Sequence, residues 1–549
     1  MKIFVTMTGM MTAALAAIPP AQAEPAPAAP AVPAEFAARC QAINNLNIET
    51  VADTPGVIVS TAVVAGRVAS PQERMMFVRR SHSQGNPMQE IPAYPTHCKV
   101  EGYITPAVKF SLSLPLSDAW NGRFMLAACD AWCGKVGEDI VVPGLHGGYA
   151  TLTNDGGHYG RAPFDGVWAH NNQQARVDFA YRANHVSAQA AKAIISEFYG
   201  KGPHHSYIAG FSKGGNAGLM TVQRYPEDFD GVFVKAPVVH YNPKNAAHFP
   251  WLALAVYPDG KSPVMAADKI PLIHRSVTQA CDALDGARDG VIDDPRQCRY
   301  DPAILLCKAG QSEGKNECLN DAQVAALRKI YAKPKNERGE IYFDYPVDIG
   351  SEMDWAGSIL PPPGPAVPGI PFALTGAATG LRYMAVKDNP GPGYDWTQFD
   401  YVKEQARIDE MSRTLDPDAV DLSAFRARGG KMIIVHGWGD AMVSAAMTID
   451  WFAQVNKKMG AGTVADFAQL YVIPGMAHGS GGTGPFVFDA QTALVRWVEQ
   501  GVAPSQLMMS DMPGTTPMRQ RAFYPWPALS RYKGKGDLGA AESYRRTAP

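Results

Sequence analysis

Beyond about residue 100, short runs of apolar and β-branched residues alternate with longer stretches in which apolar residues recur at helical spacing. Runs of the first kind predict strands, and stretches of the second kind predict helices. The predicted strands are 123–127, 148–153, 206–209, 231–234, 432–435 and 470–473, and the predicted helices are 186–199, 215–224 and 491–500. Because strands and helices alternate in this order, we predict an α/β fold built on a parallel sheet.

Residues 239–404 do not continue this alternation. They contain four of the eight cysteines, an Asp/Gly cluster and a proline-rich run at 361–371. Functional loops leave an α/β sheet at the carboxyl ends of its strands. We therefore interpret 239–404 as a large lid domain inserted into a catalytic domain of residues 100–238 and 405–549.

The first 23 residues have the pattern of a secretory signal peptide. Lys2 supplies a positive charge, residues 3–18 are mostly apolar, and Ala21-Gln22-Ala23 fits a cleavage site. A buried N-terminal helix is the alternative, and Pro19-Pro20 disfavours it. Residues 24–99 then form a tether, rich in Ala and Pro, and the start of the catalytic domain. We expect a secreted or periplasmic protein.

The composition adds arguments against nucleic acid and membranes as partners. The chain has 549 residues, 46% of them hydrophobic, and a formal net charge of -2. A near-neutral balance gives no electrostatic reason to expect nucleic acid or an anionic membrane surface as a partner. No apolar run approaches the roughly 20 residues that span a bilayer. The composition does not predict an oligomeric state.

Eight cysteines in an exported chain favour disulfides over a metal site, and the sequence has no Cys-x-x-Cys pair. Sequence alone does not fix the connectivity. The spacing suggests the pairs Cys40–Cys98, Cys281–Cys298 and Cys307–Cys318, which leaves Cys129 and Cys133 to each other as Cys129–Cys133.

Residues 210–214 read Gly-Phe-Ser-Lys-Gly, a G-x-S-x-G pentapeptide between a predicted strand and a predicted helix. The pentapeptide alone is common, but this context is typical of the nucleophile turn of an α/β-hydrolase. Ser212 is the predicted nucleophile. The backbone N–H of Lys213 would face a developing oxyanion, with a second donor from Asp130 or Ala131 in the loop after strand 123–127. We expect the charge of Lys213 to be solvated and without a chemical role.

An α/β-hydrolase supplies its catalytic residues in the order serine, acid, histidine. Asp440 follows the strand at 432–435, and His478 follows the strand at 470–473. Both positions lie at strand carboxyl ends, so we predict that Asp440 and His478 complete a triad with Ser212. Two competing residues have simpler interpretations: His436 ends its strand, and Asp450 lies within a helical pattern.

The chain resembles the tannase and feruloyl esterase family through most of its mature length. The matching segments are 120–124, 147–151, 155–158, 178–182, 224–231, 474–478, 481–485 and 531–537. The resemblance implies an α/β-hydrolase core with a lid domain, secretion, and hydrolysis of esters of aromatic acids. The nucleophile, acid and base of the family fall on Ser212, Asp440 and His478.

Two positions depart from the family. Its members typically have a cysteine just before the nucleophile and another just after the histidine, joined as a disulfide. Here those positions are Phe211 and Gly479. Two interpretations stay open: the Phe211 ring packs into the room that Gly479 leaves, or Phe211 is ordinary core and Gly479 only a turn residue.

The segment 281–291 places three carboxylates among turn glycines, which suits Ca²⁺, although a solvated Asp/Gly turn is the simpler explanation. The resemblance favours the metal. It assigns the ligands of a structural calcium ion in the lid to the Asp282, Asp285 and Asp289 side chains and to the Ala287 and Val291 carbonyls.

We therefore predict a secreted serine carboxylic-ester hydrolase that acts on esters of aromatic acids through an acyl-serine intermediate, with a small-molecule ester as its partner and no organic cofactor. Trp355, Phe372 and Tyr383 in the lid are candidates for stacking on the aryl group, with core packing as the alternative for each. A serine amidase or peptidase would use the same triad, and a non-catalytic binding protein could share the scaffold.

Overall fold

A computed structural model describes residues 32–51, 53–70, 93–311, 313–314, 317–363, 370–512 and 515–548. The predicted signal peptide, the tether up to residue 31 and residues 364–369 of the proline-rich run lie outside the described residues. Among the helices that are described, none is long and apolar enough to cross a membrane.

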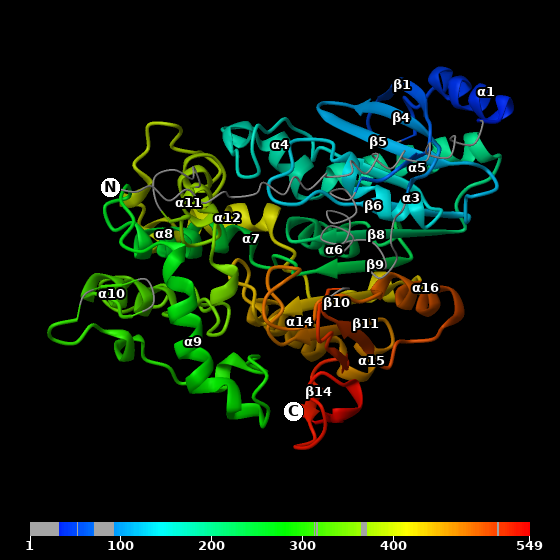
Figure 1. The fold of residues 1–549 in the computed structure, drawn as a ribbon. Helices are drawn as coiled ribbons and strands as arrows, with labels where there is room; N and C mark the ends of the chain where they lie inside the picture. Colours follow the sequence, from blue (N-terminus) through cyan, green and yellow to red (C-terminus); the bar gives the residue numbers. More distant parts are fainter. Residues whose placement is uncertain are drawn as a thin grey trace, which may run out of the picture. The chain divides into compact units, whose positions relative to one another are not determined.

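A nine-stranded sheet in the order β1-β4-β5-β7-β6-β8-β9-β10-β11 organises the fold (Figure 1). The strands from β7 to β11 in this order are parallel to their neighbours, and β1, β4 and β5 continue the sheet in antiparallel pairing. Their bounds are β1 Gly56–Val64, β4 His97–Ile104, β5 Val108–Pro115, β6 Arg123–Ala127, β7 Ala150–Asn154, β8 His205–Phe211, β9 Gly231–Lys235, β10 Lys431–Gly437 and β11 Ala468–Ile473.

The six strands expected from apolar runs are all present. The expectation of a parallel sheet is wrong for β1, β4 and β5, which were not predicted and pair antiparallel. Strand β4 explains why. Val100 and Ile104 are buried while Glu101 and Tyr103 between them are partly exposed, the alternation of a half-buried antiparallel strand. The sheet is therefore mixed, and its parallel half contains the strands that precede Ser212, Asp440 and His478.

Successive residues of the central strands enter two different hydrophobic layers. Ile434 of β10 packs with helices on one face, whereas its neighbours Ile433 and Val435 pack with α16 (Ala490–Gln500) on the other. The first layer contains α5 (Ala183–Tyr199), α6 (Lys213–Arg224) and α14 (Ala445–Met459). Because period-2 alternation divides the strand side chains between the layers, the core is a three-layer α/β/α arrangement.

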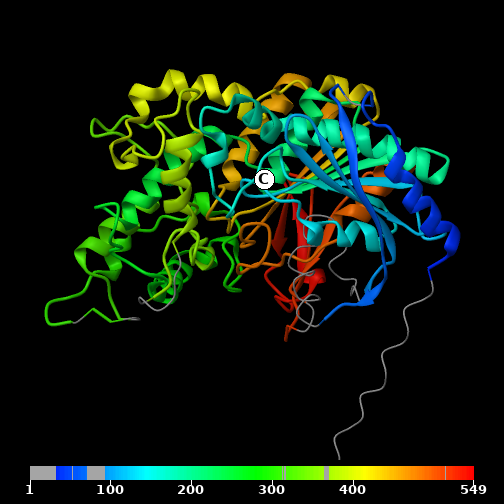
Figure 2. The same ribbon diagram turned by 90° about the horizontal axis from the view of Figure 1, so that it is seen from above.

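The segment 239–404 is mainly helical, and Figures 1 and 2 show it beside the sheet. Its apolar residues share one buried cluster with Trp132, Phe179 and Met220 of the core. The predicted boundary at 404/405 falls inside α12. The helices of eight or more residues that lie in or begin in 239–404 are α8 Phe249–Val256, α9 Ile270–Cys281, α10 Asp321–Ile330, α11 Phe372–Tyr383 and α12 Tyr401–Leu415.

Shorter elements connect and cover these parts. The remaining α-helices are α1 Ala34–Ala42, α3 Val142–His146, α4 Gln173–Val177, α7 Tyr241–Pro243, α13 Ser423–Ala427 and α15 Ala461–Ala465. The remaining strands form three antiparallel pairs, β2 Arg67–Val68 with β3 Ala93–Tyr94, β12 Leu507–Ser510 with β13 Gln520–Phe523, and β14 Leu529–Tyr532 with β15 Tyr544–Thr547.

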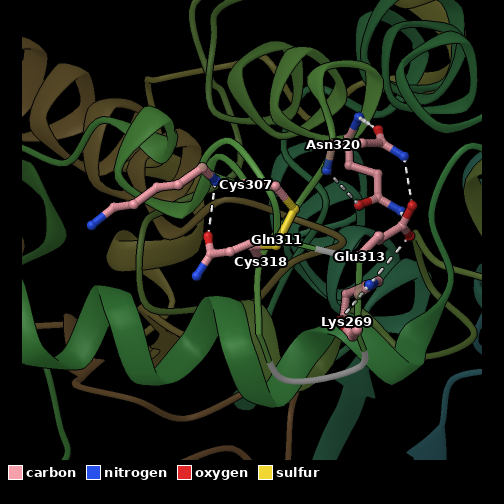
Figure 3. Close-up of a disulfide and its surroundings, with 9 residues drawn as sticks. Lys269, Cys307, Gln311, Glu313, Cys318 and Asn320 are labelled. Atoms are coloured by element: carbon pink, nitrogen blue, oxygen red, sulfur yellow. Dashed lines mark hydrogen bonds and ion pairs between the residues drawn. A yellow bond between two sulfur atoms is a disulfide. The ribbon is translucent and has the colours of Figure 1, made fainter.

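The structure forms the four disulfides that the spacing suggests: Cys40–Cys98, Cys129–Cys133, Cys281–Cys298 and Cys307–Cys318. The last of them closes a loop of the insertion beside Glu313 (Figure 3). The carboxylate of Glu313 lies 3.3 Å from Lys269 Nζ and accepts a hydrogen bond of 2.8 Å from Asn320 Nδ2. Asn320 caps α10, so the loop is joined to two helices of the insertion.

Arg176 of α4 ties the core to the insertion from inside the protein. Its side chain is fully buried and has no carboxylate within ion-pair distance among the described residues. Instead, its guanidinium donates to the carbonyls of Ala169 at 2.9 Å, Lys387 at 2.8 Å and Tyr383 at 3.3 Å, and to the Asn389 side chain. Burial lowers the pKa of Arg176 to about 10. One buried cation thus satisfies several backbone acceptors.

Arg176→Met should therefore destabilise the protein by roughly 3 kcal/mol or more, because it leaves buried carbonyls without donors. Urea denaturation followed by tryptophan fluorescence measures the change. Arg328→Met is the matched control, since Arg328 forms an exposed ion pair with Asp301 and should cost about 0–1 kcal/mol. Equal effects of the two substitutions would contradict the assignment.

Candidate active site

Ser212 lies at the turn between β8 and α6, and its backbone has φ 56° and ψ -116°. A positive φ is costly for a residue with a side chain, so neighbouring contacts must hold it. A Cβ on Gly210 would lie 2.1 Å from the carbonyl oxygen of Gly214, and a Cβ on Gly214 would lie 2.9 Å from that of Ala128. Both positions therefore require glycine, which is the physical content of the pentapeptide.

The structure brings the three predicted triad residues together. The hydroxyl of Ser212 lies 3.0 Å from Nε2 of His478, and Nδ1 of His478 lies 2.7 Å from Oδ2 of Asp440. The carboxylate of Asp440 is acceptor-only when ionised, so Nδ1–H of His478 donates to it. Nε2 then carries the lone pair that accepts from the serine hydroxyl. This arrangement can remove a proton from Ser212.

Asp440 is buried, and four donors hold it. The N–H groups of Met442 and Val443 donate to Oδ1 at 2.9 and 2.8 Å, and the rings of His478 and His436 face Oδ2. Burial alone would raise the pKa of Asp440, but the two imidazoles outweigh it and hold the pKa below its usual range. His436 thus lies under the carboxylate, within β10, and Asp450 is exposed on α14.

Asp354 of the insertion is a residue that the sequence analysis missed. Its Oδ2 accepts from the N–H of Ala441 and from the N–H of His478, both at 3.2 Å. Ala441 follows Asp440 directly, so one carboxylate bridges the loop after β10 and the loop after β11. Burial and the nearby charge of Asp440 raise the pKa of Asp354 to about 7. Asp354 ends the short 3-10 helix Glu352–Asp354 and has no fixed spacing to Ala441 or His478, so no sequence motif marks it.

A cavity of about 460 Å³ opens over Ser212 and His478. The rings of Trp132, Phe164 and Phe372 line it, whereas Trp355 and Tyr383 are buried elsewhere. A hollow of about 750 Å³ near Trp526 contains none of the triad residues, so we take the smaller cavity as the candidate site.

The three predicted oxyanion donors, Lys213, Asp130 and Ala131, all line this cavity. Lys213 begins α6, and among the described residues neither its N–H nor that of Ala131 has a hydrogen-bond partner. Ala131 has φ 51° in a loop closed by the Cys129–Cys133 disulfide.

The expectation that the Lys213 side chain is solvated is wrong. It is only 2% exposed, and its Nζ lies 4.5 Å from the centroid of the Phe179 ring. Burial lowers the pKa of Lys213 to about 7. The side chain therefore belongs to the wall of the cavity.

The acidic loop of the insertion has turn geometry at each predicted ligand. One oxygen of Asp282, Asp285 and Asp289 accepts from the N–H of Gly290, Ala287 and Val291, respectively. The three carboxylates do not all lie within 4.8 Å of one another; in the part of the chain that the structure describes, His204, His205 and Glu499 meet that criterion. Glu499 already accepts two bonds of 2.6 Å from Arg123 and one of 2.7 Å from Tyr207.

The Phe211 ring packs directly on Gly479. A Cβ on Gly479 would lie 2.2 Å from Cε2 of Phe211, and the ring centroid is 4.6 Å from that of His478. The structure thus agrees with the interpretation in which the Phe211 ring fills the space that Gly479 leaves. The contact braces the histidine loop against the end of β8 without a covalent bond.

Gly479→Ala should consequently destabilise the protein through two effects, the positive φ of 75° and the clash with Phe211. Gly481→Ala is the matched control, because Gly481 has φ 74° and no atom within 4 Å of an added Cβ. The difference in unfolding free energy isolates the clash and should be about 1–3 kcal/mol. Phe211→Ala in the Gly479→Ala background should recover part of it. Equal costs for the two alanines would contradict the packing.

The chain has relatives of known activity. A sequence profile of the family described as tannase and feruloyl esterase matches residues 94–547. The chain is 31% identical to a mono(2-hydroxyethyl) terephthalate hydrolase from Piscinibacter sakaiensis, over 94% of this chain and 93% of that protein. It is 29% identical to a probable feruloyl esterase B-1 from Aspergillus oryzae, over 80% and 82% of the two chains.

Solved structures of two related enzymes have the same fold as this chain. The crystal structure of feruloyl esterase B from Aspergillus oryzae matches with a TM-score of 0.78 and 26% identity, over 93% of this chain and all of that one. Tannin acyl hydrolase from Aspergillus niger shares the fold with a TM-score of 0.72 at 20% identity, over 95% and 97%. The chain belongs to the tannase and feruloyl esterase family and is a carboxylic-ester hydrolase of α/β fold.

Proposed function

We propose that the protein is a secreted serine hydrolase that cleaves esters of aromatic acids through an acyl-Ser212 intermediate. The observation that carries the proposal is the hydrogen-bonded chain from Ser212 through His478 to Asp440, at a cavity with aromatic walls. The names of the relatives, a terephthalate monoester hydrolase and feruloyl esterases, support an aromatic acid as the acyl group.

The chemistry follows from the positions of the protons. His478 takes the hydroxyl proton as Ser212 Oγ attacks the ester carbonyl, and Asp440 stabilises the imidazolium. The N–H groups of Lys213 and Ala131, or of Asp130, would stabilise the oxyanion of the tetrahedral intermediate. His478 then protonates the departing alcohol, which leaves the acyl-serine. Water repeats the sequence with His478 as its base, and the free acid departs.

The insertion supplies residues of the cavity wall, among them Asp354, Ser358 and Phe372. We therefore propose that 239–404 acts as the lid domain of a catalytic core and selects substrates. Of the three aromatic candidates, Phe372 is the one with a side chain at the cavity, so it is suited to contact the aryl group. Four disulfides are consistent with export, which we infer from the signal-peptide pattern of residues 1–23.

Ser212→Ala should fold normally and lose aryl-ester hydrolysis by at least about 10³-fold, because the acyl-enzyme cannot form. The variant should also fail to react with a fluorophosphonate probe. Ser480→Ala is the matched control: Ser480 lines the same cavity, and among the described residues Ser212 is the hydroxyl bonded to His478.

The same assay separates the alternatives. Full turnover by Ser212→Ala would overturn the mechanism. Equal cleavage of an aryl ester and its matching amide would favour an amidase, and no labelling of the wild-type chain would favour a binding protein.

We further propose that the acidic loop binds Ca²⁺ as a structural ion. The donor set of Asp282, Asp285 and Asp289 with the Ala287 and Val291 carbonyls has the hard oxygens that Ca²⁺ prefers. Each carboxylate accepts from a backbone N–H through one oxygen, and Oδ2 of Asp289 also accepts from the Tyr544 hydroxyl at 3.3 Å. The second oxygens of Asp282 and Asp285 are the ones that remain for a cation. Nearby, Oδ1 of Asp293 is buried without a hydrogen-bond partner among the described residues. Oδ2 of Asp293 is paired with Arg521 at 2.8 Å and lies 3.5 Å from Arg531, so arginines already balance the charge of this carboxylate.

A chelator should therefore lower the melting temperature of the purified protein, and added Ca²⁺ should restore it; binding at 100 times Kd stabilises by about 2.7 kcal/mol. Asp289→Asn should abolish the response. Asp418→Asn, at an exposed position outside the loop, should keep it. A melting temperature indifferent to chelation in the wild-type protein would count against the site.

A further inference from the structure

One wall of the cavity is built from buried polar groups. We call it the polar wall; it consists of Lys213, Tyr241, Lys244 and Asn245, each between 2 and 4% exposed. The hydroxyl of Tyr241 and Oδ1 of Asn245 have no hydrogen-bond partner in the described part of the chain. Such groups are expensive to bury unpaired, so their concentration in one wall requires a reason.

The two lysine side chains of the polar wall also lack an ion-pair partner. Within the described residues, no carboxylate lies within 4 Å of either ammonium, and neither ammonium donates a hydrogen bond. Asp130 and Asp354 line the same cavity, but neither forms an ion pair with these lysines. The two lysines therefore lie at one cavity without a paired carboxylate among the described residues, although the charge of Asp440 acts on Lys244 from farther away.

Aromatic rings give the ammonium groups partial compensation. Nζ of Lys244 lies 3.4 Å from the centroid of the Phe249 ring, and Nζ of Lys213 lies 4.5 Å from that of Phe179. A cation–π contact is worth less than a charge-assisted hydrogen bond, so it holds the lysine without satisfying it. Burial lowers the pKa of each lysine to about 7, and a bound anion would return both to their charged form.

We infer that the polar wall binds an anionic oxygen substituent, a carboxylate or a phenolate, on the aromatic ring of the substrate. Three of its members, the two ammonium groups and the tyrosine hydroxyl, are hydrogen-bond donors, and such a set matches an anion. Lys213 directly follows Ser212, so the wall lies beside the proposed nucleophile. The inference rests on the proposed function and narrows its substrates to aryl esters that carry a negative charge.

The test compares ethyl benzoates that differ only at the ring: the 4-carboxylate, the 4-carboxamide and the 4-hydroxyl compound. Wild-type protein should prefer the 4-carboxylate to the 4-carboxamide by about 10-fold or more in kcat/KM, mainly through KM. A preference for the 4-hydroxyl compound that rises with pH as the phenol ionises would identify a phenolate instead.

Lys213→Met and Lys244→Met should each reduce this preference by about 10-fold, because the 4-carboxylate loses a donor that the neutral 4-carboxamide needs less. Lys235→Met is the matched control. Lys235 is equally buried and its Nζ has no hydrogen-bond partner among the described residues, but it does not line the cavity. It should keep the preference for the carboxylate.

Two outcomes would overturn the inference. One is a wild-type protein without preference for an anionic ring. The other is an equal loss of kcat on all three esters in Lys213→Met, which would make that lysine a group that acts on the oxyanion.

A binding measurement separates this inference from the proposed function and from misfolding. Titration calorimetry of the Ser212→Ala protein with benzene-1,4-dicarboxylate and with its diamide does not depend on turnover. Tighter binding of the dicarboxylate, lost in Ser212→Ala/Lys244→Met with unchanged near-ultraviolet circular dichroism, supports the polar wall even if none of the esters is hydrolysed. Equal binding of the two compounds contradicts it.

Discussion

The turn at Ser212 depends on the contact between Gly210 and Gly214, and the rest of the site depends on that turn. Nothing larger than hydrogen fits between the last residues of β8 and the first turn of α6. The strand can therefore end abruptly, and Ser212 is held at a positive φ with its hydroxyl toward His478. The same turn begins α6 at Lys213, which places an N–H group and a buried ammonium at one cavity.

Around this turn, polar groups are buried in two different ways. Asp440 and Arg176 are fully engaged by partners, which fixes their positions and makes them part of the scaffold. The ammonium groups of Lys213 and Lys244 face aromatic rings and have no ion-pair partner among the described residues. Buried polar groups whose hydrogen bonds are all formed help to specify one structure, whereas polar groups without partners at a cavity can bind a ligand. Asp440 and Arg176 therefore stabilise the fold around the site, whereas we propose that Lys213 and Lys244 bind the substrate.

Much of this could be predicted from the sequence, for identifiable reasons. Strand β6 was expected at its observed bounds because its residues 124–127 are buried on both faces and form an uninterrupted apolar run. Ser212, Asp440 and His478 follow strands in a fixed order, so topology alone brings them together. Strand β4 was missed because one of its faces is partly exposed and polar, and β5 was missed because Ser111 and Ser113, although buried, interrupt its apolar run.

The burial of Lys213 and the position of Asp354 had no signal in the sequence. A lysine beside a nucleophile turn is expected at the surface, and its burial depends on Phe179, which comes from a distant helix. Asp354 acts through backbone N–H groups, which leave no trace in side-chain identity. Contacts of this kind are decided by tertiary packing.

The bridge made by Asp354 has a consequence for how the insertion can vary. An inserted segment that only covered a cavity could be exchanged between relatives or displaced as a rigid flap without affecting the machinery beneath it. Here one carboxylate of the insertion holds the backbone beside both Asp440 and His478, so the cover is also a structural member of the triad. The insertion is therefore not a separable module. Replacing, shortening or displacing the insertion would also remove the Asp354 carboxylate from the backbone beside Asp440 and His478.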